Sequence, residues 1–303
     1  MGINKVSIIG LGALGILFGN HLSKRMRKED LRIIASEDRI KRYSNIYCND
    51  ELCDFNFITP EEKTAPADLV IIAVKYSALK DAIKDIKNQV GENTIILSLL
   101  NGITSEKLIA EAYGEDKVLY SVAQGMDAVR EGNKLTYKNM GMICFGEKEA
   151  GVISEKVSLV EEFFKSVELP HEVQKDMYKR LWSKFMLNVG VNQTVALYRG
   201  NYGTIQVQGE ARDTMIRAMR EVILLSEKEG INLTEEDLNY WLNILDGLSE
   251  TGKPSMAQDM EAKRLSEVDL FSGAVLELGK KYLLETPVNK NFYDRVKAIE
   301  SGY

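Results

Sequence analysis

Residues 5–15 read KVSIIGLGALG, a short apolar run that leads directly into a glycine-rich turn. Gly10, Gly12 and Gly15 form a GxGxxG pattern, and a predicted helix follows at 13–25. In a strand–turn–helix unit the first glycine allows a tight turn, the second lets the backbone approach a diphosphate, and the third lets the helix pack against the strand. The phosphates then meet free N–H groups at the positive end of the helix dipole. We therefore predict a dinucleotide site, although a tight turn of another doubly wound fold has the same pattern. The predicted cofactor-binding residues of this turn are Gly10, Leu11, Gly12, Ala13, Leu14 and Gly15.

The N-terminal half alternates between apolar runs and segments with helical spacing. The predicted strands are 5–9, 31–35, 68–74, 94–100, 117–124 and 134–145, and the predicted helices are 13–25, 77–90 and 152–168. Strands that alternate with helices indicate a parallel sheet, and nearly continuous apolar runs fit strands that are covered on both faces.

The C-terminal half has only helical periodicity. Helices are predicted at 176–197, 208–229, 235–247 and 256–283. The fold class is therefore α/β, with an N-terminal Rossmann-type doubly wound sheet followed by an all-helical C-terminal domain. We expect a dinucleotide-binding Rossmann domain over residues 1–172 and a helical substrate or catalytic domain over residues 173–303.

The composition argues against several classes of protein. The 303 residues include 39 Lys and Arg against 45 Asp and Glu, and a net charge of −6 disfavours a nucleic-acid binder. No apolar run is long enough for a membrane span. Three cysteines without a CxxC pair indicate reduced thiols in a cytoplasmic protein. With only two histidines, we expect no metal site and a general acid other than histidine.

Polar residues follow the predicted strands at the sheet edge where ligands bind in doubly wound folds. Ser36 ends the second strand, where NAD enzymes usually have an acidic residue, and Arg39 and Arg42 follow it. Arginine suits contact with a 2′-phosphate, so NADP is favoured over NAD, with a solvated helix face as the alternative for both arginines. Lys75 and Asn101 follow the third and fourth strands and are further candidate cofactor residues. A solvated strand end and a simple turn explain these two equally well.

A polar stripe runs along the predicted helix at 176–197. Lys184, Asn188 and Asn192 stand four residues apart and so share one face among mainly apolar neighbours. Polar side chains in a largely buried helix cost free energy unless they have partners. The stripe therefore indicates a polar ligand pocket, with a structural hydrogen-bond network between helices as the alternative.

A second polar group lies between Ser255 and Glu267. Pro254 fits the start of a helix that Ser255 could cap, and Glu267 could be ordinary surface charge. On one straight helix these two side chains would lie about 18 Å apart. They could then serve opposite ends of a site that holds a substrate and the nicotinamide ribose together.

The chain resembles the ketopantoate reductase (2-dehydropantoate 2-reductase) family over nearly its full length. The resemblance rests on GLGALG at 10–15, VKY at 74–76, LLNGI at 99–103, KFMLNVGVNQTVAL at 184–197 and KPSMAQDMEAKRLSEVD at 253–269. It implies NADPH-dependent reduction of 2-ketopantoate to pantoate on the pathway to coenzyme A. One departure is Ser36, because many members have arginine there.

The resemblance also implies roles for individual residues. Lys184 matches the catalytic lysine that donates a proton to the carbonyl oxygen, and Glu267 matches the carboxylate that pairs with that lysine or with the nicotinamide ribose. The residues that match substrate-binding positions are Asn188, Asn192 and Ser255, and those that match cofactor contacts are Lys75 and Asn101. The open alternatives are a related reductase for another 2-oxo acid or an imine, and a non-catalytic dinucleotide sensor. A homodimer is a further expectation, because the helical half is apolar over many turns.

Overall fold

The computed structural model describes residues 2–43 and 45–303. The chain divides into two compact units. The first, here called the sheet unit, contains Met1–Leu100 and Thr104–Tyr178, and the second, the helical unit, contains Asn101–Ile103 and Lys179–Tyr303.

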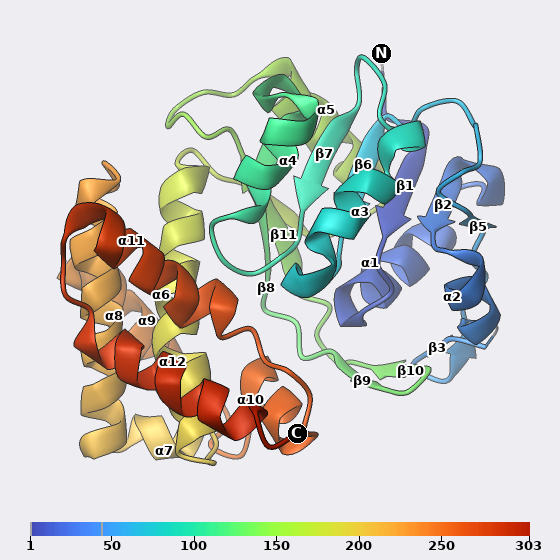
Figure 1. Cartoon of the computed structure of the whole chain (residues 1–303). Helices are drawn as coiled ribbons and strands as arrows, with labels where there is room; N and C mark the ends of the chain where they lie inside the picture. Colours follow the sequence, from blue (N-terminus) through green and yellow to red (C-terminus); the bar gives the residue numbers. More distant parts are fainter. Residues whose placement is uncertain (1, 44) are drawn as a thin grey trace. The chain divides into compact units, whose positions relative to one another are not determined.

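The sheet unit is built on an eight-stranded sheet with the order β12-β11-β8-β7-β6-β1-β2-β5 (Figure 1). Its strands are β1 (Val6–Ile9), β2 (Leu31–Ile34), β5 (Phe57–Ile58), β6 (Leu69–Ile72), β7 (Ile95–Ser98), β8 (Val118–Gln124), β11 (Met142–Gly146) and β12 (His171–Val173). The strands from β5 to β8 pair in parallel, and β11 pairs antiparallel to β8. The chain adds β2 and β5 on one side of β1 and then returns to place β6 on the other side, so the strand order reverses beside β1.

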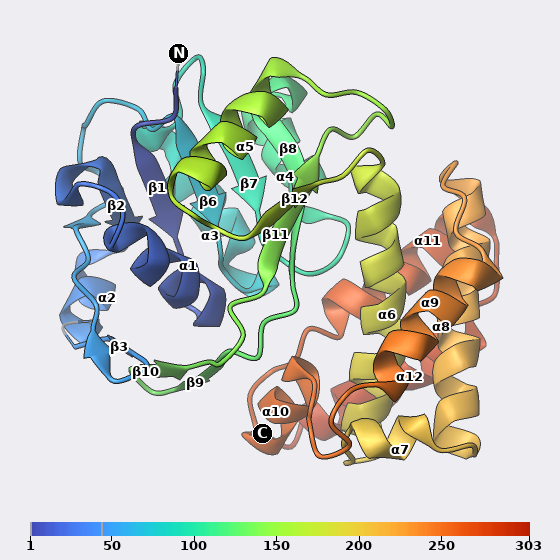
Figure 2. The same ribbon diagram turned by 180° about the vertical axis from the view of Figure 1, so that it is seen from behind.

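Helices cover both faces of this sheet, as Figures 1 and 2 show from opposite sides. On one face lie α1 (Ala13–Ser23) and α5 (Glu155–Ser166), and on the other lie α3 (Leu79–Asp85) and α4 (Ser105–Tyr113). Each face has its own apolar cluster, and every residue of β1, β2, β6 and β7 is buried. The predicted Rossmann-type doubly wound sheet is thus confirmed, with strands that are apolar because neither face meets water.

A smaller sheet completes this unit, with the order β4-β3-β10-β9. Its strands are β3 (Tyr47–Cys48), β4 (Glu51–Leu52), β9 (Val129–Glu131) and β10 (Lys134–Thr136). The single strand predicted at 134–145 is therefore wrong. The chain forms β10 and then β11, and Gly141 between them has a φ of +67° that interrupts extended backbone.

The helical unit has no strand among its described residues, as predicted. Its helices are α6 (Met177–Leu197, within this unit from Lys179), α7 (Tyr202–Gln206), α8 (Glu210–Lys228), α9 (Glu235–Asp246), α10 (Ser255–Glu261), a π-helical turn (Asp269–Gly273), α11 (Ala274–Tyr282) and α12 (Pro287–Glu300). A Cβ at Gly190 of α6 would lie 2.4 Å from Met219 of α8, so these two helices pack at close range. No helix in the described part of the chain is both long and apolar enough to cross a membrane.

The continuous helix predicted at 256–283 is wrong. Helix α10 ends at Glu261, Lys263 has a φ of +51°, and helical structure resumes only at Asp269. The Ser266 N–H and hydroxyl both donate to Glu300 Oε1, at 2.7 and 2.6 Å. Glu300 belongs to α12, a helix that our reading of the sequence missed, so a tertiary contact outweighs the local helical pattern.

The helix predicted at 77–90 is also shorter than expected. It consists of α3 flanked by two 3₁₀ turns, Tyr76–Ala78 and Lys87–Gln89.

Candidate functional site

The glycine turn lies where β1 ends, beside the end of β6. Gly10 has a φ of +96°, and a Cβ there would lie 2.6 Å from the Ala73 carbonyl oxygen. A Cβ at Gly15 would lie 1.8 Å from the Gly10 carbonyl oxygen. Both positions therefore require glycine for internal reasons, namely backbone conformation and the close approach of helix and strand.

Gly12 differs from the other two glycines. A Cβ there would lie 3.7 Å from the Ala73 carbonyl oxygen, an ordinary contact, so packing within the protein does not demand glycine. Gly12 is also the N-cap residue of α1, where no side chain accepts a hydrogen bond from the first turn. The free N–H groups and the space above them fit a bound anion such as a diphosphate.

Arg130 of β9 reaches this turn and was missed in our reading of the sequence. Its Nη1 donates to the Leu11 carbonyl oxygen, and its Nε donates to the Gly132 carbonyl oxygen at 2.9 Å. Pairing of β10 with both β9 and β3 holds the hairpin in place. The guanidinium group thus brings positive charge to the turn. Because Arg130 lies 119 residues from Leu11, only tertiary structure reveals the contact.

The other predicted cofactor residues of the sheet unit are exposed. Ser36 precedes α2 (Glu37–Arg42) as its N-cap residue, but its side chain forms no capping bond. Arg39 is exposed on that short helix, and Arg42 Nε donates to the Asp38 carbonyl oxygen at 3.2 Å. Lys75 is exposed just beyond β6. Arg39 and Lys75 are cations at the carboxyl ends of β2 and β6, the edge where Rossmann folds bind ligands.

Three of the predicted residues meet in the helical unit. Asn101 Nδ2 donates to Glu267 Oε2 at 3.1 Å, and Asn188 Nδ2 lies 3.4 Å from Asn101 Oδ1. Lys184 is half-buried one turn before Asn188 on α6, which contains the whole predicted stripe. These contacts place two amides and one carboxylate near Lys184. Asn101 thus belongs to the helical unit, although it follows a strand of the sheet.

Asn192 continues the stripe one turn further along α6. Asn188 and Asn192 are each 7% exposed, and no described residue forms a hydrogen bond with the Asn192 side chain. A polar ligand that bonds to these nearly buried amides would offset the cost of burying them.

A structural network also exists, one residue beyond the stripe. Gln193 Oε1 accepts from the Ser272 hydroxyl at 2.7 Å, and the same hydroxyl lies 2.9 Å from Asn289 Oδ1. Asn289 Nδ2 in turn donates to Glu221 Oε2 at 2.7 Å. All four side chains are buried, and their hydrogen bonds connect α6, α8 and α12. Because these polar groups bond to one another, we assign the network a structural role and not a ligand-binding one.

Ser255 takes part in none of the hydrogen bonds described above. It is the first residue of α10 and is exposed, while Pro254 is the N-cap residue, so the alternative explanation of Ser255 as a helix cap is wrong. The estimate of about 18 Å between Ser255 and Glu267 assumed one straight helix. It does not apply, because the chain leaves the helix after Glu261.

Comparison with known proteins gives two family matches and a set of full-length relatives. Residues 6–150 match the family "Ketopantoate reductase PanE/ApbA", and residues 176–300 match "Ketopantoate reductase PanE/ApbA C terminal". A 2-dehydropantoate 2-reductase of Aquifex aeolicus is 28% identical over 306 residues, which cover 98% of this chain and 97% of the relative. One from Streptococcus pyogenes serotype M1 is 26% identical over 303 residues, with 98% of each chain covered.

Solved structures share the fold at lower identity. A D-mandelate dehydrogenase in a ternary structure with NADH and anilino(oxo)acetate superposes with a TM-score of 0.86 at 20% identity, over 98% of this chain and 99% of the other. A ketopantoate reductase from Ralstonia eutropha gives a TM-score of 0.84 at 21% identity, with the same shares covered. A dimeric ketopantoate reductase from Staphylococcus aureus gives 0.79 at 20%, again over 98% and 99%.

Proposed function

The chain belongs to the ketopantoate reductase family, and we propose that it reduces 2-ketopantoate to pantoate with NADPH, on the pathway to coenzyme A. The observation that carries the proposal is the hydrogen-bonded group of Asn101, Asn188 and Glu267 beside Lys184. A reductase for a 2-oxo acid needs a proton donor and fixed hydrogen-bond donors for the oxygen atoms of its substrate, and this group offers both.

The sheet unit would hold the cofactor. The diphosphate would lie over Gly12 and the N-terminus of α1, with Arg130 beside the turn. Ser36 carries no charge to repel a 2′-phosphate, and Arg39 could pair with it. Lys75 would meet the cofactor at the end of β6. When bound, the reduced nicotinamide supplies the hydride that the carbonyl carbon of the substrate accepts.

The helical unit would hold the substrate and move the proton. As negative charge grows on the carbonyl oxygen, the Lys184 ammonium group would stabilise it and donate a proton to that atom. Asn188 and Asn192 would bind substrate oxygens, and Ser255 the carboxylate. Glu267 would hold the Asn101 amide in place and pair with the lysine or the nicotinamide ribose.

Steady-state kinetics with purified protein test this proposal. Loss of NADPH absorbance with 2-ketopantoate should be rapid, and Lys184→Ala should lower kcat by roughly 100-fold or more. The dissociation constant for NADPH, from cofactor fluorescence, should change by less than about twofold, since the lysine acts on the substrate. Lys179→Ala, on the same helix but paired with Asp237 at 3.1 Å, is the matched control. Near-normal turnover by Lys184→Ala would contradict the assignment.

A related reductase for another 2-oxo acid, with NADH, is the second candidate. It is favoured by the structural neighbour that is a D-mandelate dehydrogenase solved with NADH. Parallel assays with NADH and with a panel of 2-oxo acids separate the two candidates. Arg39→Ala should raise KM for NADPH and leave KM for NADH unchanged if NADPH is the cofactor.

We also propose a homodimer in the cytoplasm. The dimeric ketopantoate reductase from S. aureus supports the first part, and three free cysteines agree with the second. Light scattering on the purified protein tests the oligomeric state.

A further inference from the structure

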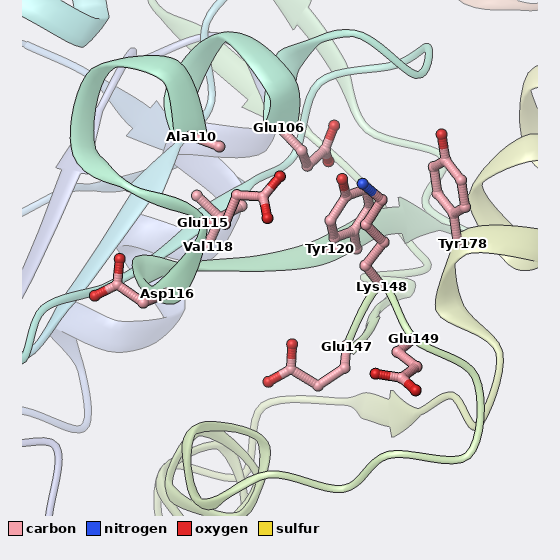
Figure 3. Close-up of a pocket in the computed structure, with 10 residues that line it drawn as sticks. All are labelled: Glu106, Ala110, Glu115, Asp116, Val118, Tyr120, Glu147, Lys148, Glu149 and Tyr178. Atoms are coloured by element: carbon pink, nitrogen blue, oxygen red, sulfur yellow. The ribbon is translucent and has the colours of Figure 1, made fainter.

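The sheet unit contains a pocket that the proposed reaction does not use. Its volume is about 580 Å³ (Figure 3). Its walls come from the first turns of α4, from the 3₁₀ turn Glu115–Lys117, from β8, from the segment after β11 and from Tyr178 at the start of α6. None of the residues proposed above for cofactor or substrate lines it. The volume falls in the range of small-molecule sites.

The walls of this pocket are strongly acidic. They contain five carboxyl groups, those of Glu106, Glu115, Asp116, Glu147 and Glu149, against the single ammonium group of Lys148. Two of the five already have lysine partners outside the pocket lining, Lys117 for Asp116 at 3.5 Å and Lys156 for Glu147 at 3.4 Å. The remaining charge disfavours a 2-oxo acid or a nucleotide phosphate and favours a cation.

Glu106 is the unusual member of this group, because it is buried. Its side chain is 1% exposed, and Oε2 accepts from the Ser105 hydroxyl at 2.9 Å. Oε1 has no hydrogen-bond partner among the described residues. In Figure 3 its carboxyl group points toward the side of the pocket that holds Tyr120 and Lys148. A buried carboxylate oxygen without a partner is costly, so this group is poised to gain from a positively charged partner.

Two tyrosine rings give the pocket a second feature that suits cations. Tyr120 and Tyr178 pack edge to face with their ring centres 5.3 Å apart. Lys148 Nζ lies 5.8 Å from the centre of the Tyr178 ring, so a primary ammonium group already occupies a cation–π position at the pocket. The described residues contain no group of three or more His, Cys, Asp or Glu arranged to hold a metal ion, which favours an organic cation.

We propose that this pocket binds a short aliphatic diamine. One ammonium group would lie between Glu106 and the tyrosine rings, and the other would reach the exposed carboxylates at the rim. The methylene chain would contact Ala110 and Val118, the apolar side chains of the wall. The proposal is independent of the reductase assignment, because it rests on other residues and needs no turnover.

Calorimetric titration of the intact protein with 1,4-diaminobutane tests the proposal. We expect saturable binding at one site per chain, and none with the neutral analogue 1,4-butanediol. Glu106→Gln, which keeps shape and removes charge, should weaken binding at least roughly tenfold, about 1.4 kcal/mol. Glu111→Gln is the matched control, because Glu111 is an exposed residue of the same helix outside the pocket.

A second variant, Lys148→Met, should strengthen diamine binding rather than weaken it. Lys148 is exposed, so Lys148→Met should leave the fold intact, and it should tighten diamine binding several-fold because a competing ammonium group is lost. The proposal is overturned if 1,4-diaminobutane gives no saturable signal up to about 10 mM. It is equally overturned if Glu106→Gln binds as tightly as Glu111→Gln, or if Lys148→Met does not bind more tightly than the unchanged protein.

Discussion

Replacement of Glu106 by glutamine should change how the stability of this protein depends on pH. Burial raises the pKa of Glu106 from 4.5 to about 7, and the Ser105 hydroxyl and nearby backbone N–H groups oppose this rise only in part. The folded protein therefore binds the proton more tightly than the unfolded chain. Its contribution to stability is fully present below pH 4.5 and is lost as the pH rises through about 7.

The difference between these two pKa values sets the size of the effect. A rise from 4.5 to about 7 corresponds to about 3 kcal/mol of unfolding free energy, lost between roughly pH 4 and pH 8. Glutamine has nearly the same shape and does not titrate. The Glu106→Gln variant should therefore gain about 3 kcal/mol relative to the unchanged protein across that interval.

Urea unfolding followed by circular dichroism, at several pH values from 4 to 8, measures this difference. Glu111→Gln, on the exposed surface of α4, should show no comparable trend with pH. If the difference between Glu106→Gln and the unchanged protein stays flat across the interval, the carboxyl group does not titrate as its burial predicts, and the reasoning is refuted.

Three further predictions concern the glycine turn and the helical core. Gly15→Ala should destabilise the protein by at least about 2 kcal/mol in urea unfolding, because its Cβ would meet the Gly10 carbonyl oxygen at 1.8 Å, whereas Gly12→Ala should leave stability within about 0.5 kcal/mol and weaken NADPH binding. Equal losses of stability in both variants would contradict the different roles given to these glycines. Arg130→Gln should weaken NADPH binding roughly tenfold in a fluorescence titration, and an unchanged affinity would exclude the guanidinium group from the phosphate site. Asn289→Leu should cost about 3 kcal/mol of unfolding free energy, because the buried Glu221 carboxylate loses its 2.7 Å amide donor; a loss below about 1 kcal/mol would show that the network is dispensable.

Much of the fold could be predicted because its signals are local. The strands of the doubly wound sheet are short runs of Val, Ile and Leu that are buried on both faces, and such runs are visible without tertiary information. Gly10 and Gly15 are required by a backbone conformation and by a contact only five residues apart. The face shared by Lys184 and Asn188 follows from helical spacing alone.

What could not be predicted depends on contacts between distant parts of the chain. Asn101 follows a strand of the sheet, and its hydrogen bond to Glu267, 166 residues away, could not be predicted from that position. No proline or glycine marks the break in the helix after Glu261. The break instead depends on a contact with a later helix, in which Glu300 binds the Ser266 backbone. The local periodicity of a sequence gives no information about the stability that such distant contacts supply.

The difference between local signals and contacts with distant parts of the chain also explains why the sequence did not single out Glu106. In the sequence it is one of many carboxylates in the first turn of a helix, a position that normally favours an exposed, ionised acid near the positive end of the dipole. The structure instead buries it, leaves one oxygen without a partner, and surrounds it with further acids and two tyrosine rings. An exposed, ionised acid at this position would interact favourably with the helix dipole without the free-energy cost of burial. Above its raised pKa the buried Glu106 carboxylate would gain from a positively charged partner, and the acidic walls of the pocket favour such a partner.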